Sequence, residues 1–327
     1  NASGNYEFIN LFPGSYRVEF VLPDNTTWAF ARPNIGADGF DSDADRTPGP
    51  NFGRTGTYTL VAGDNNATVD AGMIERASLG NVVWEDLDGN GLQGGTGENG
   101  VPNVTVSLFD GAGNPVDTDP VTAGVQNTDI TDANGEYGFT NLPPGDYYVV
   151  FTLPSGTMFT RQDVGADDTI DSDAVRLGAN QGRTVTTTLI PGENDTSWDA
   201  GILQPAALGN YVWEDVNDNG QQDEAASEGE NGLTVTLLDS TGAPVDNPNT
   251  VAVDTYTVVT ADLAGTPGYY AFTGLFPGDY RVQFTTPAGA WTFARPDLGP
   301  DATDSDASRT AGADFGRSAV VNLTAGE

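Results

Sequence analysis

Apolar and polar side chains alternate along many short segments of the chain, as they do in β-strands with one buried face. The alternation is clearest at 104–108, 147–153, 184–189 and 280–284. No segment keeps the helical spacing of apolar residues over several turns. Turn-forming pairs such as Asn134-Gly135 separate the strand segments. The pattern predicts an all-β protein of short strands joined by many turns.

Long motifs recur along the chain, which indicates tandem domains. Leu-Gly-Asn-Val-Val-Trp-Glu-Asp at 79–86 returns as Leu-Gly-Asn-Tyr-Val-Trp-Glu-Asp at 208–215. Leu-Phe-Pro-Gly at 11–14 returns at 275–278, and the copy between them, at 142–145, reads Leu-Pro-Pro-Gly. We therefore divide the chain into residues 1–77 (the later part of a repeat), 78–205 (a complete repeat) and 206–327 (a nearly complete repeat that lacks its last strand).

Each complete repeat holds roughly seven or eight strand segments, which predicts an immunoglobulin- or transthyretin-like β-sandwich. The linker at 203–207 is short and contains a proline, so the tandem sandwiches should form an elongated rod. Both ends of the sequence interrupt a repeat, so we expect neighbouring repeats. The interrupted repeats are also compatible with self-assembly into fibres. Trp84 and Trp213 are expected in or beside the core rather than stacked on a ligand.

Charge narrows the choice of partners. The chain has 47 acidic and 12 basic residues, a formal net charge of −35. We expect no nucleic-acid partner, because phosphate backbones require a basic surface. Repulsion of this size opposes a compact state unless cations neutralise it. Two interpretations follow: a solvated acidic surface of the halophile kind, or dedicated cation sites.

Missing residue types exclude several kinds of chemistry. The sequence contains no Cys, no His and no Lys. Disulfides, the usual zinc ligand, the Ser-His-Asp triad, Schiff-base lysines and Lys-Asn isopeptide crosslinks are therefore absent from the chain. No apolar stretch has the length that a bilayer span requires, so we expect no membrane insertion of this chain.

Oxygen-bearing side chains alternate in a loop near the start of a repeat. Asp86, Asp88 and Asn90 precede Gly91 with the spacing that opens an EF-hand loop. Oxygen-only ligands on a flexible loop favour calcium over magnesium. Acidic surface turns are the alternative, but recurrence at one repeat position favours calcium. The predicted ligands are Asp86, Asp88, Asn90, Leu92 (by its carbonyl) and Glu98, and in the second copy Asp215, Asn217, Asn219, Gln221 (by its carbonyl), Asp223 and Glu228 or Glu230.

A second acidic cluster occurs later in every repeat. Its carboxylates are so close in sequence that they repel one another strongly without a cation. A hydrated acidic loop is the alternative to a calcium site, and the spacing leaves open whether the two loops form one site or two. The predicted ligands are Asp38, Asp41, Asp43, Asp167, Asp168, Asp171, Asp173, Asp301, Asp304 and Asp306, with Asp70 and Asp199 as additional ligands. Arg46, Arg176 and Arg309 lie just downstream and are expected to pair with leftover carboxylates.

These motifs together resemble the B-like repeats of serine-aspartate-repeat (Sdr) surface adhesins, which are related to collagen-adhesin B-type domains. The resemblance covers the whole chain and is carried by the motifs at 131–137, 142–145, 170–173, 192–201 and 209–215. It implies secreted, cell-surface β-sandwich spacers that calcium makes rigid. It also implies the ligands Asp86, Asp88, Asn90, Glu98, Asp171 and Asp173.

The chain departs from the family pattern in three places. The loop before Glu98 is rich in glycine and lacks the acid found at Asp223. Residues 260–268 replace the Asp-Ala-Asn-Gly turn with an insertion, and no serine-aspartate tract is present.

We therefore expect an extracellular, cell-surface or secreted structural protein, in which calcium-binding repeats form a rigid stalk or filament segment. The partners would be neighbouring repeats, and a host or matrix ligand reached through domains outside this chain. An adhesive or carbohydrate-binding module is the alternative, with Trp28 and Trp291 as contacts. An enzyme is not expected, because the acid pairs that a glycosidase would need recur in every repeat within apparent calcium loops.

Overall fold

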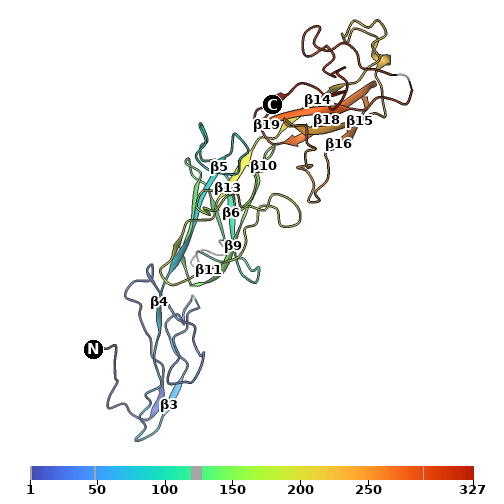
Figure 1. The fold of residues 1–327 in the computed structure, drawn as a ribbon. Helices are drawn as coiled ribbons and strands as arrows, with labels where there is room; N and C mark the ends of the chain where they lie inside the picture. Colours follow the sequence, from blue (N-terminus) through green and yellow to red (C-terminus); the bar gives the residue numbers. More distant parts are fainter. Residues whose placement is uncertain (1, 48, 119–126, 290) are drawn as a thin grey trace.

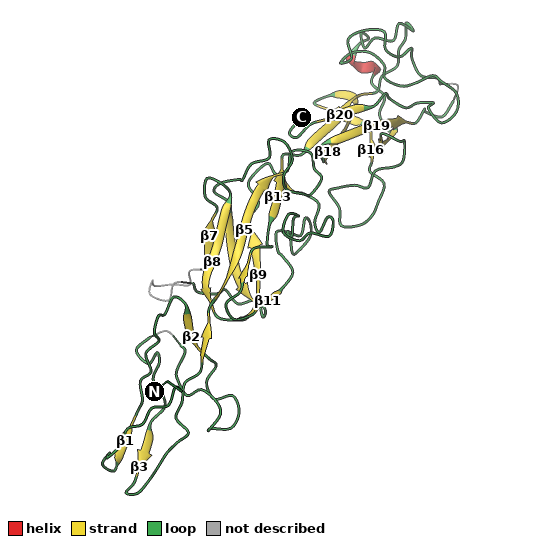
Figure 2. Ribbon diagram, turned by 60° about the vertical axis from the view of Figure 1, so that its left-hand side comes forward, coloured by secondary structure: helices red, strands yellow, loops and turns green. Residues whose placement is uncertain are grey.

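Three β-domains follow one another along an elongated molecule (Figure 1). The computed structural model describes residues 2–47, 49–118, 127–289 and 291–327. We call residues 1–77, 78–205 and 206–327 the first, middle and last repeat. Apart from the short 3-10 helix η1 (Ala226–Glu228), the regular elements of the described chain are strands (Figure 2). The predicted all-β rod of tandem sandwiches is therefore confirmed.

The middle repeat is a sandwich of two sheets. One sheet has the order β10-β13-β5-β12, with β8 also paired to β5, and the other has the order β11-β9-β6-β7. The strands are β5 (Ala77–Glu85), β6 (Thr105–Asp110), β7 (Thr128–Ile130), β8 (Glu136–Leu142), β9 (Gly145–Phe151), β10 (Met158–Phe159), β11 (Thr187–Leu189), β12 (Asn194–Asp195) and β13 (Ala200–Leu203). The alternating segments in the sequence thus lie within or beside β6, β9 and β11.

Alternation along the strands builds the core between the two sheets. In β6 the side chains of Val106 and Leu108 are fully buried, whereas their neighbours are only partly covered. From the opposite sheet Leu79, Val83 and Phe139 join the same cluster. Burying large aliphatic and aromatic side chains in this way is the main favourable contribution to the fold. Trp84 is also buried, as expected, whereas Trp213 is only half-buried.

The last repeat has the same arrangement. Its sheets have the orders β14-β18-β17 and β16-β15-β19-β20, and its core contains Leu237, Phe272 and Leu275. The strands are β14 (Ala206–Tyr211), β15 (Thr234–Asp239), β16 (Thr257–Val259), β17 (Ala261–Leu263), β18 (Thr266–Leu275), β19 (Gly278–Phe284) and β20 (Val321–Leu323). In the middle repeat β13 runs beside β5. The described part of the last repeat has no strand in the corresponding place beside β14.

The first repeat contains two small sheets and a small core. β1 (Gly14–Tyr16) pairs with β3 (Tyr58–Leu60), and β2 (Trp28–Phe30) pairs with β4 (Met73–Glu75). Phe8 is 64% exposed, whereas the equivalent Phe139 of the middle repeat is 3% exposed. Phe139 lies on β8, which pairs with β5 at Leu79, whereas the described part of the first repeat has no strand paired with the Phe8 segment in this way.

Very short linkers join the repeats. Only Arg76 separates β4 from β5, and only Gln204 and Pro205 separate β13 from β14. The Arg76 side chain donates hydrogen bonds to the carbonyl of Trp28 on one side (3.0 Å) and to that of Asn141 on the other (2.6 Å). Linkers this short, one stiffened by proline and the other fixed by hydrogen bonds, hold consecutive repeats end to end.

Candidate metal centre

The first acidic loop of the middle repeat is organised by one buried carboxylate. Asp86 follows β5 and is 0% exposed. Its Oδ1 accepts a hydrogen bond from the Gly89 amide (2.7 Å), and its Oδ2 accepts bonds from the Gly91 amide (2.8 Å) and the Thr160 hydroxyl. Gly89 and Gly91 both have positive φ (68° and 85°), a conformation that glycine adopts without strain. The loop is therefore folded around the Asp86 carboxylate.

Two further carboxylates converge on this loop. Oxygens of Asp86, Asp88 and Glu98 all lie within 4.8 Å of one another. Glu98 also accepts hydrogen bonds from the amides of Leu87 (3.3 Å) and Gly95 (2.8 Å). Burial raises the pKa of Glu98, and the charges of Asp86 and Asp88 add to that rise. Such a group of ionised oxygens is costly to assemble unless a cation lies among them.

The second acidic loop forms a separate group. Oxygens of Asp168, Asp171 and Asp173 lie within 4.8 Å of one another. Asp171 is only 4% exposed, and its Oδ1 has no hydrogen-bond partner. Burial raises the pKa of Asp173 to about 8, with further contributions from Asp168, Asp199 and Asp171. Asp167 is exposed and accepts hydrogen bonds from Thr169 instead of joining the group.

The two loops of the middle repeat are neighbours. Leu92 and Asp171 form an isolated antiparallel bridge, and the Gln93 amide donates to the Ile170 carbonyl (2.7 Å). The two carboxylate groups therefore lie on adjoining loops, and Asp171 of the second group takes part in the bridge itself. Leu92 itself lies at the contact between the loops.

Asp199 borders the second group without joining it. Its carboxylate accepts hydrogen bonds from the Val82 amide (3.0 Å) and the Asn81 side chain (3.2 Å). Its own amide donates to Asp173 (2.6 Å). Burial raises the pKa of Asp199 to about 7. The structure thus uses Asp199 to join the edge of β5 to the acidic loop.

The last repeat has the same first loop with a different closing residue. Asp215 accepts hydrogen bonds from the amides of Asn219 (3.2 Å) and Gly220 (2.8 Å). Asp223 lies against Asn217 and Asn219, whose side-chain amides donate to its carboxylate at 3.2 and 3.0 Å. Four of the predicted residues, Asp215, Asn217, Asn219 and Asp223, are therefore brought together.

Glu224 is the residue that sequence reasoning missed. Its Oε1 accepts a hydrogen bond from the Val216 amide (3.1 Å), as Glu98 does from Leu87, and its Oε2 is buried without a partner. The predicted Glu228 and Glu230 instead have their main chains paired with the strand beside Trp213, where Glu228 accepts from Glu214 and Glu230 donates to Val212. In the sequence, only its position directly after Asp223 could have indicated that Glu224 belongs to this loop.

The second acidic loop of the last repeat matches that of the middle repeat. Oxygens of Asp301, Asp304 and Asp306 lie within 4.8 Å of one another. Burial raises the pKa of Asp306 to about 6, with added effects of Asp301 and Asp304. Gln221 forms the bridge to Asp304 that Leu92 forms to Asp171. The two-loop arrangement is therefore repeated.

The first repeat brings its acids together less closely. Among the described residues, Asp38, Asp41 and Asp43 do not form a carboxylate group like those above. Both oxygens of Asp43 are occupied, one by the Tyr58 hydroxyl (2.8 Å) and one by the Asp70 amide (2.9 Å). Burial raises the pKa of Asp70, and Asp43 and Asp41 raise it further. Asp41 nevertheless keeps a buried Oδ1 without a partner.

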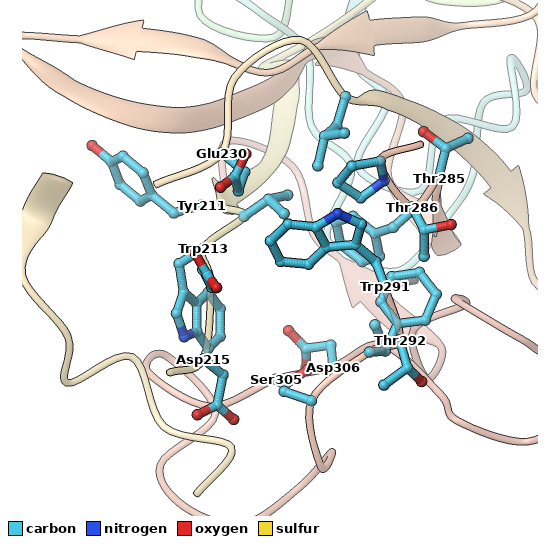
Figure 3. A pocket seen from close by; sticks show the side chains of 18 of the residues that line it. Tyr211, Trp213, Asp215, Glu230, Thr285, Thr286, Trp291, Thr292, Ser305 and Asp306 are labelled. Carbon is cyan, nitrogen blue, oxygen red and sulfur yellow. The ribbon is translucent and has the colours of Figure 1, made fainter. Parts of the chain in front are cut away.

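A cavity of about 440 Å³ opens in the last repeat, and Trp291 projects into it (Figure 3). Its wall includes Trp213, the residue equivalent to Trp84. In the middle repeat, β13 runs parallel to β5 beside Trp84 and pairs with β10. The cavity therefore corresponds to the place that β13 fills in the middle repeat, which accounts for its aromatic lining without a ligand.

The downstream arginines do not all behave as predicted. Arg309 lies 3.6 Å from Asp218, an acid of the first loop. Arg176 instead donates a hydrogen bond to the carbonyl of Pro248 in the next repeat.

Among the described residues, no helix has the length and apolar character needed to cross a membrane.

Fold and site together define a class of protein: tandem acidic β-sandwich repeats with paired carboxylate loops. The chain belongs to the SdrD B-like domain family, which matches residues 1–73, 77–202 and 206–327. The resemblance seen in the sequence is thus confirmed. The family consists of repeats of Sdr surface adhesins and is not enzymatic, in agreement with the expected extracellular or cell-surface location.

Curated relatives include two staphylococcal proteins. The chain is 35% identical over 320 residues to serine-aspartate repeat-containing protein F of Staphylococcus epidermidis, covering 95% of this chain and 17% of that protein. It is 35% identical over 290 residues to serine-aspartate repeat-containing protein D of Staphylococcus aureus, covering 88% of this chain and 19% of that protein. The chain thus spans less than a fifth of the length of these relatives.

Similar solved structures include a streptococcal ancillary pilin, with 14% identity, a TM-score of 0.29 and coverage of 92% of this chain and 71% of that one. The minor pilin GBS52 of Streptococcus agalactiae has 13% identity and a TM-score of 0.25, with coverage of 76% of this chain and 90% of that one. Scores this low support no inference.

Proposed function

We propose that the chain is a calcium-braced spacer, in which cations bound at the acidic loops make successive β-sandwich repeats into a stiff stalk or filament segment. Asp171 carries the proposal. A buried carboxylate oxygen without a hydrogen-bond partner, close to two other carboxylates, loses its hydration and gains nothing in return unless a cation binds it.

The chemistry of the donors favours calcium. Each group offers only oxygen atoms, and the chain has no Cys or His to attract softer metals. Calcium accepts six to eight oxygen ligands in flexible arrangements, whereas magnesium requires a near-ideal octahedron. Bound calcium would also offset part of the net charge of −35 that otherwise opposes folding.

The candidate ligands fall into two sets per repeat. In the middle repeat Asp86, Asp88, Asn90, Glu98 and the Leu92 carbonyl would serve the first loop, and Asp168, Asp171 and Asp173 the second. In the last repeat Asp215, Asn217, Asn219, Asp223, Glu224 and the Gln221 carbonyl would serve the first loop, and Asp301, Asp304 and Asp306 the second. In the first repeat Asp38 and Asp41 remain the candidates.

The mechanical part of the proposal rests on the linkers. One or two residues between terminal strands leave little freedom for bending between repeats. Calcium that binds only the folded state would stabilise each repeat by RT ln(1 + [L]/Kd), about 2.7 kcal/mol per site at a hundredfold excess over Kd. Neighbouring repeats of the same protein would be the direct partners, and any adhesive contact would be made by domains outside this chain.

Calorimetric titration of the whole chain with calcium tests the proposal. The parent should bind several ions, and chelation should lower its melting temperature. Asp171→Asn should reduce the number of bound ions, because it removes the charge of the buried carboxylate. Asp146→Asn is the matched control: Asp146 is exposed and accepts a hydrogen bond from Thr188 (2.6 Å), so the same loss of charge should leave the stoichiometry unchanged. Absence of calcium binding by the parent would refute the proposal.

A further inference from the structure

Two arginines of the middle repeat enclose an aromatic side chain of the last repeat. The Arg161 guanidinium carbon lies 4.4 Å from the centre of the Phe276 ring, and that of Arg176 lies 5.6 Å from it. The Phe276 side chain is only 7% exposed, because the two arginines and residues of its own repeat cover it. A guanidinium over an aromatic face is attracted by the electron-rich ring, most strongly where water is excluded.

Hydrogen bonds hold both partners in place. Arg176 donates to the Pro248 carbonyl of the last repeat, and Arg161 donates to the Gly89 carbonyl of its own repeat. On the other side, the Tyr280 hydroxyl donates to the carbonyl of Phe276 (2.9 Å) and fixes the Phe276-Pro277 loop. Burial lowers the pKa of Arg176, and nearby Arg161 lowers it further while Asp246 of the last repeat opposes the change. The junction is therefore a specific contact between charged and aromatic groups.

The first acidic loop is itself part of this junction. A Cβ atom placed on Gly89 would lie 3.0 Å from Cδ of Pro277 and 3.4 Å from Cβ of Phe276. Gly89 lies between Asp88 and Asn90, two of the candidate calcium ligands. The loop that would hold the cation thus touches the next repeat directly and is also bonded to the arginine that covers Phe276.

The junction between the first and middle repeats uses the same positions. Arg32 and Arg46 align with Arg161 and Arg176, and Tyr147 aligns with Tyr280. Burial raises the pKa of Tyr147, and the charges of Arg46 and Arg32 counteract that rise. The Tyr147 hydroxyl donates to the carbonyl of Pro143, the residue that aligns with Phe276 (2.6 Å). The loop fixed by a tyrosine hydroxyl and the two aligned arginines are therefore present at this junction as well, with Pro143 in place of the aromatic ring.

Equivalent residues without such a neighbour behave differently. Phe12, which aligns with Phe276, is 84% exposed, although the Tyr16 hydroxyl fixes its loop in the same way (2.7 Å). At the far end, Arg295 and Arg309 lie 3.1 and 3.6 Å from Asp218. Asp218 aligns with Gly89. In the last repeat the residue at the Gly89 position is thus an acid, and both aligned arginines pair with it.

We propose that the arginine-bearing end of a repeat, formed by Arg161, Arg176 and the Gly89 loop, is a docking surface whose partner is the Phe276-Pro277 loop of a following repeat of the same kind. We further propose that ordering of the Gly89 loop by calcium determines whether this junction is held stiffly. The second part rests on the function proposed above. The first depends only on the geometry of the junction.

Distance measurements across the junction test this proposal in the whole chain. Because the chain has no cysteine, Thr186→Cys and Thr257→Cys provide one spin-labelled pair, with one exposed site in each repeat. In calcium the parent should give a narrow distance distribution. Phe276→Ala should at least double its width, and so should Gly89→Asp, which copies Asp218 of the last repeat. Phe12→Ala is the matched control and should leave the width unchanged.

Chelation separates the two parts of the proposal. After chelation, the distance distribution of the parent should broaden to the width measured for Phe276→Ala. The distribution of Phe276→Ala itself should broaden little further. A distribution for Phe276→Ala as narrow as that of the parent overturns the docking surface. Equal broadening of both chains on chelation overturns the coupling to calcium. If titration shows no bound calcium, the proposed function fails, and the contrast between Phe276→Ala and Phe12→Ala still decides the docking surface. Should Phe276→Ala melt early, Arg161→Ala replaces it, since Arg161 is an exposed side chain.

Discussion

Two buried carboxyls give the calcium-free chain an unusual pH dependence. Burial raises the pKa of Asp173 from 3.8 to about 8 and that of Asp199 from 3.8 to about 7. Both groups therefore hold their protons more tightly in the folded chain than in the unfolded one. Their contribution to stability is complete below about pH 4 and is lost as the pH rises through the folded-state values. The calcium-free middle repeat should thus be weakened by the ionisation that calcium requires.

The expected change is large enough to measure. Between the two pKa values of a group, stability falls by about 1.4 kcal/mol per pH unit. For two such groups the loss between about pH 5 and pH 7 is on the order of 3–5 kcal/mol. In a domain of this size that corresponds to a fall of roughly 10–20 °C in the melting temperature of the middle repeat.

Calorimetry in the presence of a chelator at both pH values is the appropriate assay. Asp173→Asn should show a weaker pH dependence than the parent, and the exposed Asp146→Asn should follow the parent. Added calcium should reverse the trend, because it binds ionised carboxylates and competes with protons. A melting temperature in chelator that stays level or rises between about pH 5 and pH 7 would refute the reasoning.

Three further changes test the packing by thermal unfolding. Phe272→Ala should cost about 3–5 kcal/mol, because Phe272 is fully buried in the last repeat; Phe40→Ala, at a site that is 94% exposed, should cost nothing measurable. Gly100→Ala should cost several kcal/mol, because a Cβ there would lie 1.6 Å from the Asn134 carbonyl oxygen, and equal stability would contradict that contact. Tyr137→Phe should cost about 1 kcal/mol, since its buried hydroxyl donates a 2.7 Å hydrogen bond to a main-chain carbonyl. An unchanged melting temperature would mean that this hydrogen bond contributes nothing to stability.

Local patterns in the sequence were sufficient for several of the strands and for the clustering of many of the acids. The alternating segment at 104–108 overlaps β6, because a period of two determines which face of a strand is buried. Asp86, Asp88 and Glu98 converge as the loop spacing predicted. Asp168, Asp171 and Asp173 also converge, since they lie within one short loop.

Contacts set by strand register were beyond sequence reasoning. Glu224, rather than Glu228 or Glu230, bonds to the first loop of the last repeat, because main-chain pairing holds the later residues beside Val212 and Glu214. Asp199 faces the edge of β5, which depends on the parallel pairing of β13 with that strand. The arginine contacts across the junction depend on how two domains meet, which no local pattern encodes.

The parallel pairing of β13 with β5 has a mechanical consequence. These are the strands by which the chain leaves and enters the middle repeat, and they pair at Val83–Glu85 and Ala200–Ile202. Tension along the chain pulls the start of β5 and the end of β13 in opposite directions, parallel to the strands. Their hydrogen bonds lie across that direction and must break together, rather than one after another as in an unzipping hairpin. The middle repeat is therefore loaded in shear, the geometry in which a small sheet resists extension best.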